Sequence, residues 1–486
     1  MHRALSGLAP GIALAIALAG CTVGPDFKPP SVRAPSAWGP EPQGVASTTV
    51  SAEIDTQWWR SFHDPELTSL AQRLAKQNLD LKTAAEHVLQ SVAETRVAAA
   101  QGLPHIEGQS IYNYDRASIN GTNSLLVLAP GASVNFSLYQ EGLQSSWELD
   151  LFGKVRRAVE AREAETLASV EDRRAIAVAA LAELAQDYLQ LRGTQAILAL
   201  TQHNLAIADN DITLVQSRFG NGYANTLDLA QAKGQRDTIA SQLPPLEERQ
   251  SQLINALGLL LAETPRALEQ ELSAPAALPA VPPSVPVSLP GTLVRQRPDV
   301  REAEAKLHAA TAQTGVAVAQ FYPDVTLMGG VNVQSLHTGN LFTLGSYQFN
   351  VGPTVTIPIF EGGQLRGNLQ LAQSQQREAA IAFQRAVLTA WQEVDDALTA
   401  YTQAQRQETE TARAVSENQI ALAAAQQRYA QGLVDMLNVN QALAQLLESQ
   451  TSLVNSNVEI ATDLVNLYRA LGGGWAIAEP AAKDTD

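Results

Sequence analysis

Proline and glycine are missing from several long stretches of this chain, and these stretches predict helices of unusual length. Residues 368–431 contain neither residue type, and residues 154–219 contain one glycine and no proline. At 1.5 Å per residue, the first stretch would be about 96 Å long as one continuous helix. Further helices are predicted over residues 66–101 and 433–470. A helix this long cannot be buried in a compact domain, so we expect a coiled coil or a helical tube.

Between the predicted helices, four segments alternate apolar and polar side chains, which is the period of a β-strand. These segments are residues 106–114, 143–151, 325–333 and 347–359, of which the first has the weakest pattern. Strands of about ten residues cross a membrane when they are tilted. Lipid on one side and water on the other would explain the two faces. A half-buried soluble sheet has the same period, but the flanking helices are too long and Gln-rich to cover such a sheet compactly.

Four strands are too few to close a barrel within one chain. Single-chain outer-membrane barrels have at least about eight strands. An open sheet edge in lipid leaves backbone donors and acceptors unpaired, which costs several kcal/mol for each group. Several copies of the chain must therefore share one barrel, and the strand count alone allows two copies or three. Residues 118–133 and 335–346 are predicted to be hairpin loops.

Two segments of the chain are similar at a constant offset, which indicates an internal repeat. Residues 215–232 match residues 425–442 at Gln216/Gln426, Arg218/Arg428, Gly222/Gly432, Leu227/Leu437, Gln231/Gln441 and Ala232/Ala442. Each half is predicted to follow one plan: a helix, two strands, a very long helix, a tight turn and a returning helix. Between the halves, residues 265–290 hold seven prolines and cannot be a regular helix throughout.

Composition and charge argue against several other functions. The 486 residues carry a net charge of −16 without a basic cluster, so a nucleic-acid partner is not expected. Cys21 is the only cysteine, which excludes an intrachain disulfide and a thiolate metal cluster. The seven histidines are scattered, and no nucleotide-binding loop, serine-nucleophile elbow or HExxH pair is present. We therefore expect no enzyme activity, no metal site and no cofactor.

The first twenty residues predict a secretory signal peptide, because they combine a short polar start with an apolar core too short for a spanning helix. They end in Leu18-Ala19-Gly20-Cys21, which resembles the bacterial lipobox, in which the cysteine receives a diacylglycerol. A plain secretory signal with an incidental cysteine is the alternative. Thr22 follows the cysteine, and in such lipoproteins a residue other than Asp there indicates the outer membrane. Residues 24–44 are rich in proline and predict an extended tether.

Several motifs together resemble the TolC-like outer-membrane factors, specifically the lipidated, NodT-type branch that serves tripartite efflux. The motifs are Gly24-Pro25-Asp26-Phe27, Trp58-Trp59 with Phe62 and Asp64-Pro65-Glu66-Leu67, Trp147-Glu148-Leu149-Asp150-Leu151-Phe152-Gly153, and Arg297-Pro298-Asp299-Val300 with Ala303-Glu304. The resemblance extends from Cys21 to about Gly472. It implies an α+β membrane protein that forms a homotrimer. Twelve strands would form one β-barrel, twelve helices a periplasmic α-barrel, and the Pro-rich connector and chain ends a mixed equatorial belt.

The resemblance also implies a function and a set of domains. The chain would be a passive duct in the outer membrane of a Gram-negative bacterium, carrying small molecules from an inner-membrane efflux pump and a periplasmic adaptor to the exterior. Lipid on Cys21 would anchor it. The predicted segments are a signal peptide (1–20), a lipidated tether (21–61), a first repeat (62–264), the connector (265–291), a second repeat (292–472) and a tail (473–486).

The turns at residues 219–225 and 429–435 are the expected adaptor contact. Gly222 and Gly432 should take positive φ there, and Arg218 and Arg428 precede them. Asp228 and Asp435 are candidate gate charges, which would form rings or salt links across the lumen. The alternative is that these charges are simply solvated. Family members commonly carry an aspartate one turn into the returning helix, whereas this chain has Asn440 and Ala230 there. This difference argues against a cation site at the entrance or moves it to Asp228 and Asp435.

Two other classes of protein remain as alternatives. A lipid-anchored coiled coil that tethers the membrane to the cell wall would explain the lipobox and the helices, but not the four alternating segments. A periplasmic enzyme would need a catalytic arrangement, and none is found. Among ducts, protein secretion is the second choice after efflux, and lipidation together with Trp58-Trp59 favours efflux.

Overall fold

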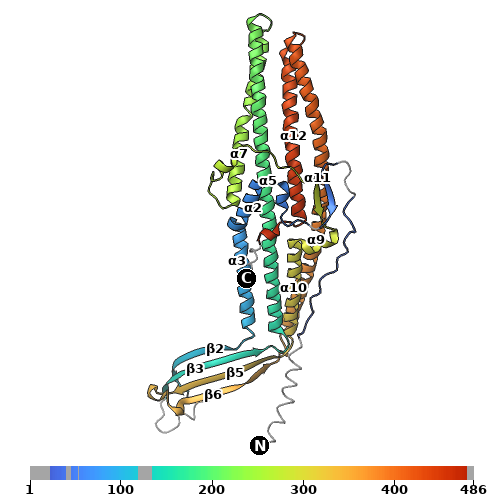
Figure 1. Cartoon of the computed structure of the whole chain (residues 1–486). Coiled ribbons are helices and arrows are strands. Elements are labelled where there is room, and N and C mark those ends of the chain that lie inside the picture. The colour runs from blue at the N-terminus through green and yellow to red at the C-terminus, as the bar shows by residue number, and fades with distance from the viewer. Residues whose placement is uncertain (1–21, 40–44, 53, 119–133, 479–486) are drawn as a thin grey trace, which may run out of the picture. The chain divides into compact units, whose positions relative to one another are not determined.

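The computed structural model describes residues 22–39, 45–52, 54–118 and 134–478, and Figure 1 shows the order of its helices and strands. These residues fall into two compact units. Unit 1 contains residues 22–30, 89–168 and 304–382, and unit 2 contains residues 31–88, 169–303 and 383–478. Each unit combines pieces from both halves of the sequence, so the predicted repeats describe the chain but not its compact units.

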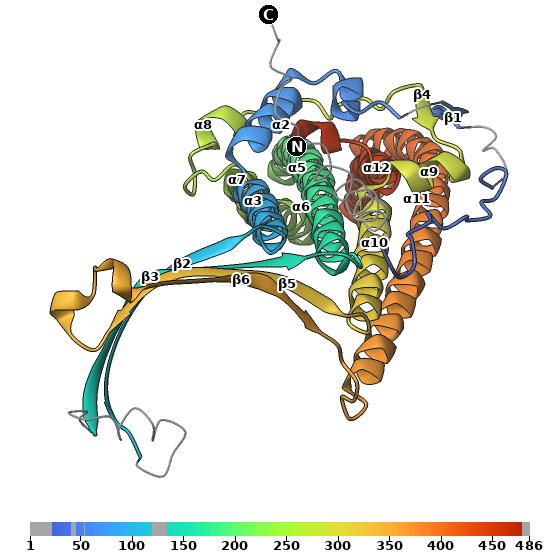
Figure 2. The same ribbon diagram turned by 90° about the horizontal axis from the view of Figure 1, so that it is seen from below.

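Unit 1 contains one antiparallel sheet of four strands, in the order β2, β3, β5, β6. The strands are β2 (His105–Arg116), β3 (Asn135–Leu149), β5 (Asp324–Ser335) and β6 (Tyr347–Thr356). All four strands predicted from the alternating pattern are therefore present. Figure 2 shows that they bend together into a curved sheet. Among the described residues, β2 and β6 each pair on one side only, so both edges of the sheet are open.

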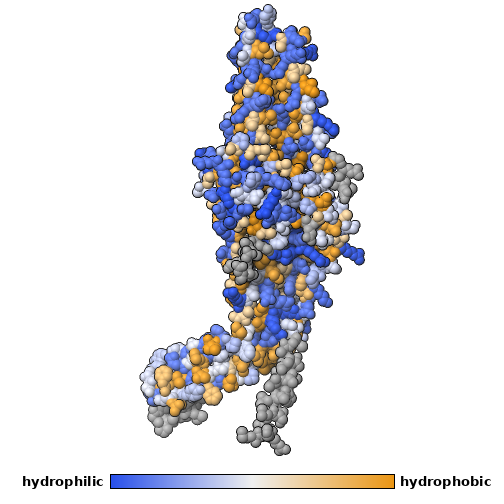
Figure 3. Space-filling model, in the orientation of Figure 1, coloured by the Kyte–Doolittle hydropathy of each residue, from blue (hydrophilic) through white to orange (hydrophobic). Residues whose placement is uncertain are grey.

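The pairing of the strands places apolar side chains beside one another on one face of the sheet and polar side chains on the other. Leu143 lies opposite Val331, which in turn lies opposite Phe349, and all three side chains are exposed. On the other face, Glu148 of β3 lies opposite Thr326 of β5. Orange apolar patches are visible on the sheet in Figure 3. One face of the sheet thus leaves large apolar side chains uncovered within a single chain.

Two strands end earlier than the alternating pattern predicts, although β3 also begins earlier. β3 ends at Leu149 because Asp150 turns away and accepts hydrogen bonds from the first backbone N–H groups of α5 (Lys154–Gly220), at 3.2 and 2.9 Å. β6 ends at Thr356, two residues before Pro358. The alternation of apolar and polar side chains continues beyond both points, whereas the pairing of the backbone with the neighbouring strand does not.

The predicted helix over residues 66–101 is wrong, because the structure has two helices there. α2 (Pro65–Gln77) and α3 (Leu79–Ala100) are separated by Asn78, whose backbone is extended, with φ −53° and ψ 131°. The Asn78 side-chain oxygen accepts the Leu81 N–H at 2.9 Å, and its NH2 group donates to the Leu260 carbonyl at 2.9 Å. Asparagine favours such caps over helix interiors, and a search for glycine and proline alone misses this break.

The two longest predicted helices are confirmed. α5 and α11 (Gln364–Ala430) have 67 residues each. After α5 the chain returns as α6 (Thr226–Ala240) and α7 (Leu243–Leu260), whereas after α11 it returns as one helix, α12 (Met436–Ala470). The interruption between α6 and α7 stands just before the two prolines at positions 244 and 245. No helix in the described ranges is both long enough and apolar enough to cross a membrane.

The Pro-rich connector is irregular, as predicted. It carries α8 (Glu269–Leu272) and β4 (Ser284–Val287), which pairs in parallel with β1 (Thr48–Ser51). α9 (Pro290–Gln296) and α10 (Pro298–Ala319) follow it. The hairpin loop predicted at 335–346 contains the short helices η2 (Thr338–Asn340) and η3 (Leu344–Ser346). Most of the other predicted loop, residues 119–133, lies outside the described residues.

The aromatic motif near the start of the chain belongs to the core of unit 2. Trp58, in the short helix η1 (Trp58–Phe62), stacks on Tyr468 with 5.1 Å between ring centroids. Asp64 caps α2 by accepting the Leu67 N–H at 2.9 Å, and it also accepts the Tyr188 hydroxyl at 2.8 Å. A last short helix, η4 (Trp475–Ala478), ends the described chain. These motif residues are therefore needed for packing.

Candidate functional site at the helical turns

The turns after α5 and α11 have the same backbone. At the first turn, Tyr223 N–H donates to the Arg218 carbonyl at 2.8 Å, and at the second turn Leu433 N–H donates to the Arg428 carbonyl at 2.9 Å. This is the bonding pattern of the Schellman helix end, which places a left-handed residue just after the helix. Gly222 has φ 78° and Gly432 has φ 76°, so the predicted positive φ is confirmed at both.

The two candidate gate charges are caps of the returning helices. Asn225 and Asp228 form a reciprocal capping box at α6, with hydrogen bonds of 3.0 and 3.1 Å. At α12, Asp435 is the N-cap and its carboxylate accepts from Asn438. The repeat therefore keeps one Asn and one Asp in each pair but exchanges their positions. A carboxylate in the first turn also interacts favourably with the helix dipole.

The two arginines that precede the turns have different surroundings. The Arg218 guanidinium lies over the ring of Tyr429, 4.9 Å from its centroid, and Nη1 donates to the Ala430 carbonyl at 2.7 Å. Arg218 thus joins the end of α5 to the end of α11. Arg428, its counterpart in the repeat, is exposed. The neighbouring aromatic residues differ in the same way, because Tyr429 is 4% exposed and Phe219 is 44% exposed.

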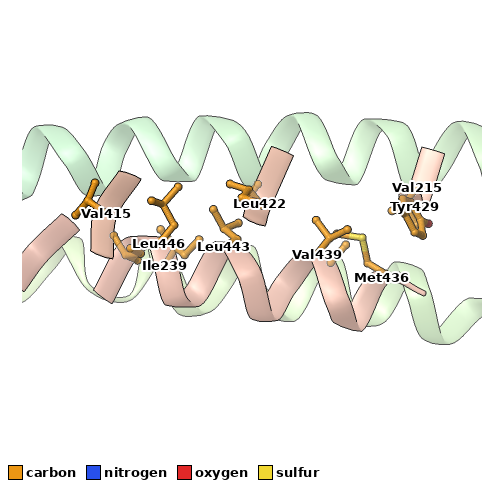
Figure 4. Close-up of a cluster of buried hydrophobic side chains, with 12 residues drawn as sticks. Val215, Ile239, Val415, Leu422, Tyr429, Met436, Val439, Leu443 and Leu446 are labelled. Carbon is orange, nitrogen blue, oxygen red and sulfur yellow. The ribbon is translucent and has the colours of Figure 1, made fainter. Parts of the chain in front are cut away.

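Below the turns, α5, α6, α11 and α12 share one apolar core. Figure 4 shows Tyr429 beside Val215, with Val439 and Leu443 further along the same interface. This packing extends from the turns down the hairpins, because its buried members are Ala208, Val215, Ala232, Ile239, Val415, Leu422, Tyr429, Met436, Val439, Leu443, Leu446 and Leu447. The hairpins of the two halves therefore support each other within one chain.

One charged residue in this core was missed by the sequence analysis. Asp211 is 8% exposed, and its carboxylate accepts from the Gln426 side chain at 3.2 Å. Burial raises the pKa of the Asp211 carboxyl, and the hydrogen bond from Gln426 opposes that shift. Asp211 stands three residues after Ala208 and four before Val215, so helical spacing places it on the buried stripe. This helical spacing is the sequence signal from which the burial of Asp211 could have been predicted.

The remaining predictions concern the lipid attachment site, the position of a possible aspartate ring, and metal binding. Cys21 and the signal peptide lie outside the described residues. Asn440, in the slot where the family commonly has aspartate, is 9% exposed, and its counterpart Ala230 is exposed. Among the described residues, no group of three or more His, Cys, Asp or Glu side chains is placed to hold a metal ion.

Comparison with known proteins gives consistent matches over nearly the whole chain. The family model described as outer membrane efflux protein matches residues 70–263 and 289–473. The solvent efflux pump outer membrane protein SrpC of Pseudomonas putida is 32% identical over 95% of this chain and 97% of its own length. The probable outer membrane lipoprotein SilC of Salmonella typhimurium is 30% identical over 94% of this chain and 96% of its own length.

A solved structure agrees with these matches. The outer-membrane channel OprN is similar with a TM-score of 0.85 and 28% sequence identity, over 94% of this chain and all of that chain. The matched segments of the family model together cover more than half of the sequence. The chain therefore belongs to the family of outer membrane efflux proteins, and it is an efflux channel of the bacterial outer membrane.

Proposed function

We propose that this protein is the outer-membrane duct of a tripartite efflux system and works as a homotrimer without catalysis. In this proposal three copies contribute twelve strands to one β-barrel and twelve helical segments to one α-barrel in the periplasm. The connector and the chain ends form a mixed belt around the helices. An inner-membrane pump supplies the energy, a periplasmic adaptor links pump to duct, and small molecules pass through the water-filled bore.

The observation that carries this proposal is the sheet with two open edges. β2 and β6 leave their outer backbone groups unpaired within the described chain, while one face of the sheet exposes Leu143, Val331 and Phe349. Lipid around that face would leave the open edges without water, and each unpaired group would then cost several kcal/mol. Pairing β2 of one copy with β6 of the next removes both edges. The family membership supports the number three.

The helical turns support an adaptor contact. Arg218, Gly222, Arg428 and Gly432 are the proposed contact residues, and apolar side chains stand exposed beside them. Tyr223 is 76% exposed and its counterpart Leu433 is 64% exposed. Exposed apolar groups rimmed by polar residues are typical of protein docking sites. Lipid on Cys21 would anchor the duct in the outer membrane, and the description of SilC as a lipoprotein supports this anchor.

Asp228 and Asp435 remain proposed gate charges, and their capping role decides how to test them. Replacing either by alanine would remove a cap together with a charge. At an N-cap such as position 435, asparagine serves about as well as aspartate. At position 228 an asparagine oxygen can still accept the Asn225 N–H, so Asp228→Asn and Asp435→Asn keep the caps and remove the charge. We expect an increased closed-state conductance of single channels for these variants. Unchanged conductance in both would remove the gate from the proposal and leave the duct.

Cross-linking tests the shared barrel. Three intervening strand spacings of about 4.8 Å separate β2 from β6 within one chain, which is too far for a disulfide. We would combine Gln109→Cys with cysteine at Gln348, Asn350 or Gly352 in turn, so that three registers between copies are tested. We expect at least one pair to give covalent dimers and trimers on denaturing gels, while single-cysteine controls stay monomeric. Monomers for all pairs, with a monomeric mass in detergent, would sink the proposal.

Efflux itself is tested in cells. A deletion strain should become more susceptible to antibiotics and dyes, and the wild-type gene should restore resistance. The Cys21→Ser variant measures how far the lipid contributes. Unchanged susceptibility towards a broad panel, together with loss of a secreted protein, would instead favour the protein-secretion alternative.

A further inference from the structure

The segment that follows the lipid attachment site is bound to unit 1 rather than free. Thr22–Phe27, which we call the anchor segment, contains no helix or strand, bends at Gly24, and contacts the start of α5 and the middle of α10. Val23 N–H donates to the Phe152 carbonyl at 3.1 Å, and the Val23 carbonyl accepts from Arg157 Nε at 3.3 Å. The first residues of the predicted tether therefore have fixed partners.

Charged and aromatic groups hold the end of the anchor segment. Arg157, whose side chain is 5% exposed, donates from Nη2 to Asp26 at 2.6 Å and from Nη1 to Glu160 at 2.8 Å. Glu160 in turn hydrogen bonds to His308 Nε2 at 3.0 Å. The His308 ring stacks on Phe27 at 4.4 Å and 15°. One connected network thus binds both side chains of the Asp26-Phe27 pair.

Glycines make room for the anchor segment and for the Arg157 side chain that binds it. A Cβ on Gly24, which has φ 92°, would lie 2.5 Å from the Gly315 Cα. A Cβ on Gly153, which has φ 83°, would lie 2.2 Å from Thr22 Cγ2, and one on Gly315 would lie 2.9 Å from Arg157 Cδ. Such distances require the absence of a side chain. We name Gly153, Arg157, Glu160, His308 and Gly315 the anchor cradle.

The anchor cradle stands at the junction between the sheet and the helices of unit 1. Gly153 follows the end of β3 at Leu149 by four residues and precedes the first residue of α5. The ring of Phe152, whose carbonyl binds Val23, stacks on Tyr322 at 4.8 Å. Near the end of β6, Ile359 and Phe360 are 92% and 87% exposed. Exposed aromatic and apolar residues at strand ends are typical of a membrane–water interface.

We propose that the anchor segment and the anchor cradle form a clamp that sets the position of the lipid. The inference rests on the proposed lipidation of the preceding cysteine. Consecutive Cα atoms are about 3.8 Å apart, so a lipid on that cysteine is attached within one residue of the clamped Thr22. The clamp holds the acyl chains beside the membrane end of α5, where they enter the same bilayer as the apolar face of the sheet.

Gly315→Ala is the sharpest variant for the clamp. Alanine favours α10 as a helix more than glycine does, so loss of α10 is not expected. Its Cβ, however, would lie 2.9 Å from Arg157 Cδ and so displace the side chain that binds Val23 and Asp26. The matched control is Gly367→Ala in α11, where an added Cβ meets nothing within 4 Å. Hydrogen–deuterium exchange of the purified full chain should be at least tenfold faster over residues 22–27 in Gly315→Ala and unchanged in the control. Wild-type exchange at the rate of unstructured chain over these residues would overturn the clamp.

A double-mutant cycle then separates lipid positioning from simple packing. We would measure the yield of assembled trimer in outer membranes for wild type, Gly315→Ala, Cys21→Ser and the double variant. If the clamp acts through the lipid, Gly315→Ala lowers the yield several-fold when Cys21 is present and has no further effect in Cys21→Ser. An equal loss in both backgrounds would overturn lipid positioning. Mass spectrometry of wild type reports the acylation separately, so an unmodified cysteine would refute the proposed lipid while the exchange experiment still tests the docking.

Discussion

The turns at residues 219–225 and 429–435 have one backbone and two different sets of side-chain contacts. Both end a 67-residue helix with the same hydrogen-bond pattern and a glycine of positive φ. Within one chain, however, Arg218 covers Tyr429, whereas Arg428 and Phe219 stay exposed. The repeat fixes how each turn is built. The side-chain contacts of a turn depend on which other turn lies beside it. Within the described part of one chain, Arg218 has Tyr429 of the other half as a partner, whereas Arg428 has no such aromatic partner.

The largest expected effect is that of Arg218→Ala. The variant loses the charged hydrogen bond to the Ala430 carbonyl and the contact with the Tyr429 ring, which together contribute about 1–3 kcal/mol at a partly exposed position. We expect hydrogen exchange over residues 425–435 to become about tenfold faster, with little change over the sheet. Arg218→Lys is the matched control, because it keeps the charge but loses the planar fork. Equal exchange in wild type and Arg218→Ala would show that the contact does not hold the turns together.

Alanine at the two glycines should have nearly equal effects, because the backbone of the turns is the same. An L-residue in the left-handed region costs about 1–2 kcal/mol. An added Cβ meets open space at Gly222 and only an ordinary contact with Arg218 at Gly432. We expect Gly222→Ala and Gly432→Ala to accelerate exchange at their own turns by similar factors. A tenfold difference between the two variants would show that the turns differ in backbone strain as well as in contacts.

A smaller effect is expected at the exposed pair. In the proposed trimer the next copy would supply Phe219 to Arg428, reproducing the Arg218–Tyr429 contact between chains. A cation over an aromatic ring at an exposed site contributes about 0.5–1 kcal/mol. We therefore expect Arg428→Ala and Phe219→Ala to be coupled by this amount in a double-mutant cycle on trimer stability. Additive effects of the two substitutions would mean that Arg428 does not contact Phe219 of the next copy as Arg218 contacts Tyr429 within one copy.

The sequence predicted what depends on periodicity and missed what depends on single polar side chains. The long helices, the four strands and the positive φ of Gly222 and Gly432 follow from local composition. The break at Asn78 was missed because the prediction considered only glycine and proline. Asn78 caps α3 by accepting the Leu81 N–H, and it also donates to the Leu260 carbonyl, 182 residues away. The contacts of Arg218 and Asp211 likewise need the packing of α5 on α11, which no single helix encodes. Asp228 and Asp435 were recognised as charges, but their capping role depends on Asn225 and Asn438.

The smallest expected effect is a pH dependence of the packing between α5 and α11 within one chain. The corresponding contact between copies would lack it. Asp211 is buried between α5 and α11, and its counterpart in the repeat is Ala421. Because burial raises the pKa of the Asp211 carboxyl in the folded protein, the folded state binds a proton more tightly than the unfolded state does. Stability of the hairpins should therefore rise as the pH falls from neutral through the raised pKa, and this gain should end below the ordinary aspartate pKa of about 3.9.

Asp211→Asn tests this dependence directly. The asparagine oxygen can still accept from Gln426, but the group no longer titrates. At neutral pH we expect stronger protection from exchange in the variant than in wild type over residues 205–216, and near pH 4 the difference should vanish. Asp209→Asn is the control, because Asp209 lies two residues earlier on α5 at the surface, paired with Arg236 at 3.1 Å. Wild-type protection that rises with pH, after correction for the intrinsic rate, would contradict the role of burial at Asp211 and make the two interfaces alike in their response to acid.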